Sequence, residues 1–170
     1  WDLTAGYQIL PRFPEDFEYL ESNVLLSEAY SAFDNEVILE FTGVLDQTSA
    51  ETTGNYSFDS GSTVETAALD SNVIVLSIVP PASGTHDTLT ISGLADTTGK
   101  EINMDVPINT GIWSIDSIMT DADGDGVPDM AGQLFVITGT VISPDFAGDE
   151  GTDQALYDGT GGIFAFSGED

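Results

Sequence analysis

The sequence predicts an all-β protein, in which an antiparallel sandwich is followed by a smaller, incomplete β-meander. Three observations lead to this prediction. Short runs of β-forming residues recur about every ten residues from Asn23 onward, turn residues such as Asp-Asn, Ser-Gly and Pro-Pro separate them, and no stretch carries a convincing helical period. Because 41% of the 170 residues are hydrophobic, the chain can form substantial cores, and we do not expect it to be disordered.

The sandwich is expected to span residues 23–108. Residues 1–22 mix aromatic, proline and acidic residues without a clean period, and we interpret them as an extended leader that packs on a neighbour. Within 36–41, Val37, Leu39 and Phe41 share one face, as the two-residue period of a strand requires. Residues 48–51 form at most one helical turn. The expected strands are 23–29, 36–41, 56–58, 63–69, 73–78, 88–92 and roughly 102–108.

A linker at 109–131 leads to a second, partial β-module at 132–170. Its long alternating strand, loop, short strand, Asp-Gly-Thr-Gly-Gly turn and final strand predict a meander of three strands. Such a meander leaves a sheet edge with unpaired backbone groups, which the sandwich, the leader, a neighbouring molecule or residues lost from the chain must cover. We expect the strand at 162–166, or the long strand at 134–142, to bond to a segment outside 112–170, with the leader as the favoured donor.

Two segments of the sandwich carry a family signature. Residues 37–57 read Val-Ile-Leu-Glu-Phe-Thr-Gly-Val-Leu-Asp-Gln-Thr-Ser-Ala-Glu-Thr-Thr-Gly-Asn-Tyr-Ser, and residues 84–99 read Gly-Thr-His-Asp-Thr-Leu-Thr-Ile-Ser-Gly-Leu-Ala-Asp-Thr-Thr-Gly. In this order and at this distance, they resemble the bacterial Ig-like modules of surface-layer and other secreted multidomain proteins. The resemblance implies an Ig-like antiparallel sandwich that acts as a spacer or adhesive unit without catalytic residues. His86 and Lys100 depart from the family pattern, in which an aromatic residue and Asn are common at these positions.

A second resemblance covers about 112–168. Its three segments are Ile-Trp-Ser-Ile-Asp at 112–116, Gly-Gln-Leu-Phe-Val-Ile-Thr-Gly-Thr-Val-Ile-Ser-Pro-Asp at 132–145, and Gln-Ala-Leu-Tyr-Asp-Gly-Thr-Gly-Gly-Ile-Phe-Ala-Phe at 154–166. They resemble the start of the OB-type β-barrel modules found beside extracellular nucleases and in surface proteins. The resemblance implies an OB-like barrel of which this chain holds only part.

The charge limits the partners of the chain. Thirty acidic residues against Arg12 and Lys100 give a formal net charge of −28. Such a surface repels phosphate backbones and anionic lipids and attracts cations, so we expect no nucleic-acid partner. No apolar run approaches about 18 residues, and we expect no membrane insertion. Folding this chain forces like charges together, which bound divalent cations, a high-salt medium or both can offset.

The acidic run at 121–129 predicts a calcium loop. Three aspartates stand at i, i+2 and i+4, and Gly126 allows a sharp turn, as in loops that surround calcium with hard oxygen ligands. The predicted ligands are Asp121, Asp123, Asp125, Asp129 and the carbonyl group of Val127. Position 12 of the pattern is Gly132 instead of Glu, so the loop resembles thrombospondin type 3 or dockerin-like repeats, with a further ligand from Asp116, another loop or water. The alternative is a solvated acidic linker.

A second acidic group lies in the loops of the second module. It consists of Asp145, Asp149, Glu150, Asp153 and Asp158. These residues offer a second cation site, or they are acidic only because the whole chain is. With thirty carboxylates, close pairs arise by chance, so spacing alone assigns no general acid and base.

No constellation for catalysis is evident in the sequence. His86 is the one histidine and lies in a Ser-Gly-Thr-His-Asp segment, and the chain has no Cys, which argues against a hydrolase triad and against zinc. The Gly-Thr-Gly-Gly run at 159–162 lacks the Lys of a phosphate-binding loop. The aromatic residues Phe135, Tyr157, Phe164 and Phe166 have no accompanying cations for nucleic-acid stacking, and we expect them to be core residues.

The leading functional hypothesis is a non-catalytic structural, surface or assembly protein that is extracellular or at the cell surface and is stabilised by calcium. Its partners would be calcium and other protein modules or copies of itself. Two alternatives remain: an ancillary N-terminal region of a larger secreted nuclease or hydrolase, and a filament subunit that assembles by strand donation from residues 1–22. A high-salt habitat would explain the acidity without calcium, although it would not explain the ordered aspartate spacing.

Overall fold

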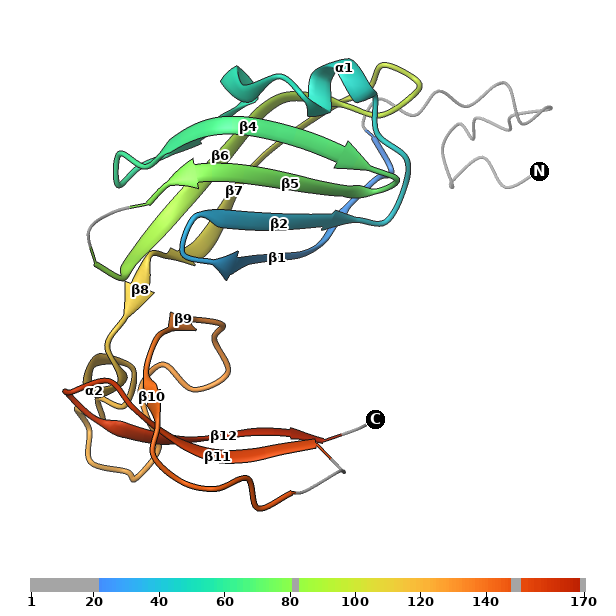
Figure 1. Ribbon diagram of the computed structural model, residues 1–170. Coiled ribbons are helices and arrows are strands. Elements are labelled where there is room, and N and C mark those ends of the chain that lie inside the picture. Colours follow the sequence, from blue (N-terminus) through green and yellow to red (C-terminus); the bar gives the residue numbers. More distant parts are fainter. Residues whose placement is uncertain (1–21, 81–82, 148–150, 169–170) are drawn as a thin grey trace, which may run out of the picture.

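Two antiparallel sheets form the sandwich of this protein, whose computed structural model describes residues 22–80, 83–147 and 151–168 (Figure 1). The first sheet has the strand order β1-β2-β5-β4, and the second has the order β3-β6-β7. The strands are β1 (Leu26–Phe33), β2 (Glu36–Phe41), β3 (Tyr56–Phe58), β4 (Thr63–Asp70), β5 (Val73–Val79), β6 (Thr85–Ala95) and β7 (Glu101–Thr110). The described chain is thus all-β, as predicted.

Alternation along the central strands builds the sandwich core. In β2, Val37 and Leu39 are fully buried and Phe41 is 1% exposed, while the residues between them are only half-buried. Strand β5 alternates in the same way, and Leu89 and Ile91 of β6 face them from the second sheet. Each sheet therefore contributes one apolar face, and the two faces pack together as the period of two requires.

The predicted strands differ from the observed ones mainly at their ends. Strands β2 and β3 have the predicted limits, β4 and β5 each extend one residue further, and β6 and β7 are longer than predicted. The prediction of a first strand at 23–29 was wrong in position, because β1 starts at Leu26 and continues to Phe33. The later half of β1 carries little hydrophobic alternation. Its pairing with β2 positions it.

The helical turn expected at 48–51 is present as α1 (Gln47–Ala50), followed by the 3₁₀ turn η3 (Thr53–Asn55). Asp46 caps α1 by accepting a hydrogen bond of 2.8 Å from the Ser49 backbone N–H. The buried Tyr56 hydroxyl donates to the carbonyl oxygen of Ala50 at 2.7 Å, and burial raises the pKa of Tyr56 above its ordinary value. The turn thereby closes one end of the core.

The second module contains the predicted meander as the sheet β10-β11-β12. The prediction of one long strand at 134–142 was wrong, because β9 and β10 are separate and pair with different partners. A Cβ atom on Gly139, between them, would lie 3.2 Å from the carbonyl oxygen of Tyr157, so the chain passes close to β11 there. The elements are β8 (Ile112–Trp113), α2 (Ile115–Ile118), β9 (Val136–Ile137), β10 (Thr140–Val141), β11 (Gly151–Tyr157) and β12 (Gly162–Gly168).

Strand β8 leads the chain from the sandwich into the second module (Figure 1). It pairs in parallel with β9, so the region assigned to a linker contains the end of β7, β8 and α2 before the acidic loop begins. The predicted leader lies outside the described residues except for Ser22. Within the described residues, no helix is long and apolar enough to cross a membrane.

Candidate functional site

The acidic loop is organised around the Asp121 carboxylate. This group accepts hydrogen bonds from the backbone N–H groups of Gly124 at 2.8 Å, Asp125 at 3.2 Å and Gly126 at 2.9 Å. These bonds, that of Gly126 foremost, hold the pKa of Asp121 below its usual range. Gly126 has φ +89°, a left-handed conformation that side-chain-bearing residues rarely adopt. The glycine therefore permits the turn that wraps the loop around Asp121.

The structure brings three of the predicted ligands together. Asp121, Asp123 and Asp129 each present a carboxylate oxygen within 4.8 Å of the others. The Asp125 carboxylate instead accepts a bond of 2.8 Å from the N–H of Val127, so it turns toward the backbone two positions further along the chain. The Asp116 side chain does not belong to this group. The local loop thus supplies three of the carboxylates, while Asp125 and the carbonyl of Val127 stay predicted ligands.

The three carboxylates have the chemistry and spacing that calcium requires. Calcium takes oxygen ligands at about 2.3–2.6 Å, so two ligands of one ion lie at most about 5 Å apart. The 4.8 Å limit on the three aspartate oxygens falls within this span. The Ala122 N–H also donates to Asp129 at 3.1 Å, which ties the end of the loop to its start. A cation bound here would receive its remaining ligands from water or from the rest of the loop.

The second acidic group stabilises turns in the described residues. Asp145 accepts bonds from the N–H groups of Ala147 at 3.0 Å and Asp153 at 2.9 Å. Asp158 lies apart from them in the β11–β12 turn. Asp149 and Glu150 are outside the described residues. Among the described residues, this region contains no group of three acidic side chains arranged to hold a metal. A second cation site therefore stays a prediction from the sequence.

Asp158, a member of the second acidic group, and Asp96, which was not predicted as a site residue, fix the ends of strands. Asp158 accepts from the N–H groups of Ile115 at 2.7 Å and Gly161 at 2.9 Å, which joins the β11–β12 turn to α2. Asp96 accepts from Thr98 and from the Ser22 hydroxyl, at 2.7 Å for the latter. Hydrogen bonds, led by Gly161 for Asp158 and by Thr98 for Asp96, lower the pKa of both carboxyl groups. In the folded protein, both carboxyl groups therefore stay charged at pH values at which the same groups begin to bind protons in the unfolded chain.

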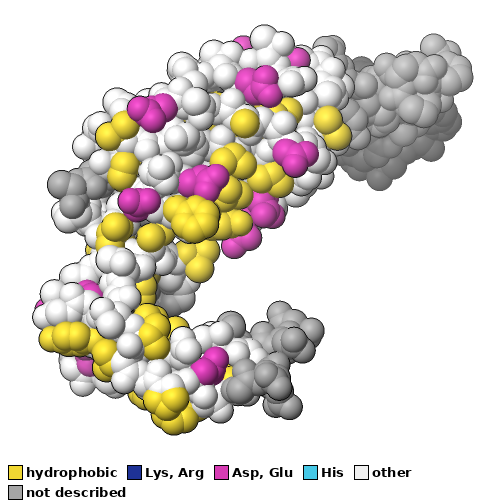
Figure 2. All heavy atoms as spheres, in the orientation of Figure 1, with side chains coloured by type: hydrophobic (Ala, Val, Ile, Leu, Met, Phe, Trp, Pro, Cys, Tyr) yellow, Lys and Arg dark blue, Asp and Glu magenta, His cyan; other side chains and the backbone are white. Residues whose placement is uncertain are grey.

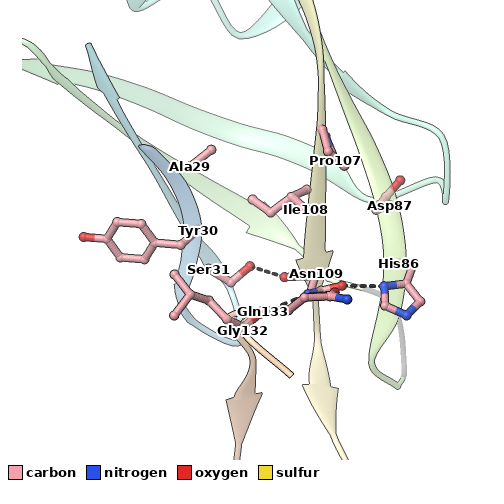
Figure 3. Close-up of a pocket in the computed structure, with 11 residues that line it drawn as sticks. Ala29, Tyr30, Ser31, His86, Asp87, Pro107, Ile108, Asn109, Gly132 and Gln133 are labelled. Atoms are coloured by element: carbon pink, nitrogen blue, oxygen red, sulfur yellow. Dashed lines mark hydrogen bonds between the residues drawn. The ribbon is translucent and has the colours of Figure 1, made fainter. Parts of the chain in front are cut away.

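A groove of about 480 Å³ lies where the sandwich meets the second module (Figure 3). Strands β1, β6 and β7 and residues 132–134 line it. The Ser31 hydroxyl donates to the backbone carbonyl of Asn109 at 2.7 Å, and His86 Nδ1 lies 2.6 Å from the Asn109 side-chain oxygen. Because both groups bond to Asn109, the groove contains no Ser–His pair of the kind that activates a nucleophile.

Trp113 and Asn109, which the sequence did not single out, connect the two modules. The Trp113 ring is 7% exposed and lies between His86, with ring centroids 4.7 Å apart, and Phe135, at 5.1 Å with edge-to-face geometry. The Asn109 amide donates to Gln133 at 3.2 Å and to the carbonyl oxygen of Leu134 at 3.1 Å. His86, although exposed, therefore packs its ring against Trp113 from β6.

The expectation that the aromatic residues of the second module are core residues was wrong for three of them. Phe164 is 67% exposed, Phe166 is 76% exposed and Tyr157 is 46% exposed, whereas Phe135 is half-buried against Trp113. Figure 2 shows apolar side chains on the surface of both modules, with acidic side chains spread over the sandwich face in view. The short meander has too few elements to cover both of its faces.

Comparison with known proteins identifies the fold. No protein-family model matches the chain, and no curated protein matches it. The chain is similar to the N-terminal part of the bacterial S-layer protein SbsC, with a TM-score of 0.50 at 15% sequence identity. This similarity covers 85% of the chain and 33% of that structure, so the chain spans about a third of its length.

Two further structures of this S-layer protein match the chain. S-layer protein rSbsC(31-844) matches with a TM-score of 0.47 at 16% identity, over 85% of the chain and 19% of that structure. Domains 1-6 of SbsC match with a TM-score of 0.47 at 15% identity, over 86% and 19%. At such identities, only the fold is comparable. The N-terminal SbsC structure therefore supports a surface-layer-like β-architecture, while the Ig-like and OB-like assignments stay predictions.

Proposed function

We propose that this chain is a non-catalytic structural segment of an extracellular, cell-surface protein and that calcium stabilises it. The observation that carries the proposal is the fold shared with the N-terminal part of an S-layer protein over 85% of the chain. The sequence agrees, because its surface-layer resemblance was recognised from two separate segments. The charge of −28 favours cations and disfavours nucleic acids and anionic lipids as partners.

The groove supports a structural role over a catalytic one. Its polar side chains hold strands and modules together: Ser31 bonds to β7, and Asn109 bonds to His86, Gln133 and Leu134. A hydrolase would instead need a nucleophile and a base that bond to each other.

Antibodies raised against the purified chain are expected to label intact cells of the organism that produces it. Surface labelling follows if the protein is displayed outside the cell envelope, since antibodies do not enter intact cells. The measurement is immunogold electron microscopy, with permeabilised cells and an antibody against a cytoplasmic protein as controls. Labelling that occurs only after permeabilisation would contradict the surface location.

The calcium part of the proposal concerns the Asp121–Asp129 loop. Three carboxylates within 4.8 Å repel one another, and a divalent cation between them offsets that repulsion. The loop follows α2, whose first backbone N–H is held by Asp158 of the meander. A bound ion would therefore stiffen the segment that runs from α2 to β9, and with it the connection between the modules.

Adding millimolar Ca²⁺ to chelator-treated protein is expected to raise its melting temperature. Binding to the folded state alone stabilises it by RT ln(1 + [L]/Kd), about 2.7 kcal/mol at a hundredfold excess over Kd. Asp123→Asn combined with Asp129→Asn should remove most of the gain, whereas Asp34→Asn in the β1–β2 turn, a matched exposed carboxylate, should retain it. Differential scanning calorimetry with and without chelator measures the shift.

An equal gain from Na⁺ at the same ionic strength would show general charge screening instead of a calcium site. Asp125→Asn separates two descriptions of the site. A large loss of the calcium effect indicates the full aspartate series of the sequence pattern, and a small loss indicates the three-carboxylate group of the structure.

A further inference from the structure

Strand β12 has a free edge in the described part of the chain. It lies at the end of the β10-β11-β12 sheet, and β11 is its one paired neighbour there. Ala155 of β11 directs its backbone toward β10, because its carbonyl accepts from the Ile142 N–H at 2.9 Å and its N–H donates to Ser143. In an antiparallel pair, the residue opposite Ala155, Phe164, therefore directs its own N–H and C=O away from β11.

The same reasoning applies to Phe166. It lies opposite Asp153, whose carbonyl accepts from the Phe146 N–H at 3.0 Å on the other side of β11. The edge of β12 thus offers N–H and C=O groups at alternate residues, as an added strand requires. The seven residues of β12 provide an edge of ordinary strand length.

An apolar face accompanies this edge. The cross-strand register places Phe164 and Phe166 on one face together with Tyr157, and these side chains are 67%, 76% and 46% exposed. Ile142, which bonds to Ala155 across from Phe164, is 62% exposed. An added strand would cover this face if it carried apolar side chains at every second residue.

Residues 3–9 of the chain have this pattern. They read Leu-Thr-Ala-Gly-Tyr-Gln-Ile, so Leu3, Ala5, Tyr7 and Ile9 alternate with Thr, Gly and Gln. The period of two places these apolar side chains on one face of an extended strand. The segment has seven residues, the same number as β12.

The charge of this segment suits an acidic acceptor. Residues 1–13 contain one acidic residue, Asp2, and Arg12, one of the two basic residues of the chain, so they are formally neutral while the rest carries −28. The second module, 132–170, contains acidic residues and no Lys or Arg. Residues 1–13 therefore meet less repulsion on approaching that module than other acidic parts of a second copy would.

The placement of the two ends favours a partner molecule over the same chain. Ser22, where the described chain begins, bonds to Asp96 at the end of the sandwich near α1, whereas the second module is attached through β8 at the opposite end and β12 starts there beside α2 (Figure 1). The ten residues of β7, which lead away from the Asp96 end, span about 33 Å. The fourteen residues from Ile9 to Ser22 reach at most about 45 Å, so bringing Ile9 to the start of β12 within one chain would take an almost fully extended leader.

We propose that residues 3–9 of one copy add as a strand to the β12 edge of a second copy, with their apolar side chains over Phe164 and Phe166. Because the donor and acceptor are different surfaces of the chain, the contact is heterologous and repeats head to tail into linear oligomers. The inference rests on the proposed structural function and names its partner, a second copy of this chain.

Two variants of this 170-residue chain test the contact. Tyr7→Asp with Ile9→Asp removes the donor pattern, and Phe164→Pro removes an outward N–H and an aromatic side chain from the acceptor edge, where proline is tolerated. Each variant alone is expected to be monomeric in sedimentation velocity, at concentrations where the wild type forms a ladder of oligomers. An equal mixture of the two variants should form dimers and nothing larger, since one intact donor meets one intact acceptor.

Circular dichroism verifies that both variants fold, and Phe164→Asp with Phe166→Asp replaces the proline variant if that one does not. A monomeric wild type overturns the inference, and so does association that persists in both variants. If the wild type is monomeric and the donor variant melts at a lower temperature, residues 3–9 pair with β12 of their own chain. That result also overturns the inference. Surface labelling and the calcium shift are independent of these results, so failure of the contact leaves the proposed function intact.

Discussion

Phe41→Ala is expected to lower the free energy of unfolding of the sandwich by about 3–5 kcal/mol. Phe41 is 1% exposed and lies at the end of β2, where its backbone N–H bonds to the carbonyl oxygen of Asn72 at 2.9 Å. Alanine removes the ring without changing the backbone, so the cost comes from lost burial and the cavity that remains. Because domains are stable by only about 5–15 kcal/mol, this is a large fraction of the total.

Phe33→Ala provides the matched control. Phe33 ends the neighbouring strand β1 and is 64% exposed, so the same change there should alter stability by less than about 0.5 kcal/mol. Urea unfolding followed by tryptophan fluorescence and circular dichroism measures both variants. Similar losses for Phe33→Ala and Phe41→Ala would show that the burial pattern of β2 does not define the core.

Alternation allowed the sandwich to be predicted, and its limits explain the errors. Val37, Leu39 and Phe41 give β2 a clear period of two, and the strand has the predicted bounds. The stretch 23–29 was placed too early because Val24, which is buried, precedes the paired region, while Leu25 is 62% exposed. In the sequence, a buried residue that precedes a strand looks like part of the strand. Only the pairing with β2, which begins at Leu26, shows where β1 starts.

The divided strand at 134–142 shows what periodicity omits. Apolar residues continue through this range, but Val136 and Ile137 pair in parallel with β8 while Thr140 and Val141 pair with β11. Gly139 between them was visible in the sequence and marks the change of partner. Hydrophobic alternation indicates which residues can form strands, and it does not indicate which strands they will join.

The candidate metal site was predictable because its signal is local. Asp121, Asp123 and Asp129 come from one loop, and the sequence spacing already places them near each other. The junction residues Asn109 and Trp113 come from the ends of β7 and β8 and contact residues more than twenty positions away in sequence. Trp113 was part of a recognised segment, yet nothing local indicated that its ring would contact both modules.

Trp113→Ala is expected to cost about 3–5 kcal/mol and to uncouple the two modules. Trp113 is only 7% exposed, and its ring contacts His86 of the sandwich and Phe135, which precedes β9. Its indole N–H has no hydrogen-bond partner among the described residues, so its contribution is packing. Calorimetry should show one transition in the wild type and two in the variant, with the second module melting first because its core is smaller.

Gly84→Ala tests the same contact from the other side. A Cβ atom on Gly84 would lie 2.3 Å from Cγ of Trp113, so the ring must move in the variant. This movement would also strain the hydrogen bond of 2.7 Å that the Gly84 N–H donates to the carbonyl oxygen of Ile112. Gly54→Ala is the control, because a Cβ atom there meets nothing within 4 Å. We expect Gly84→Ala to split the transition as Trp113→Ala does and Gly54→Ala to leave it unchanged. A single unshifted transition in Gly84→Ala would mean that Trp113 does not connect the modules.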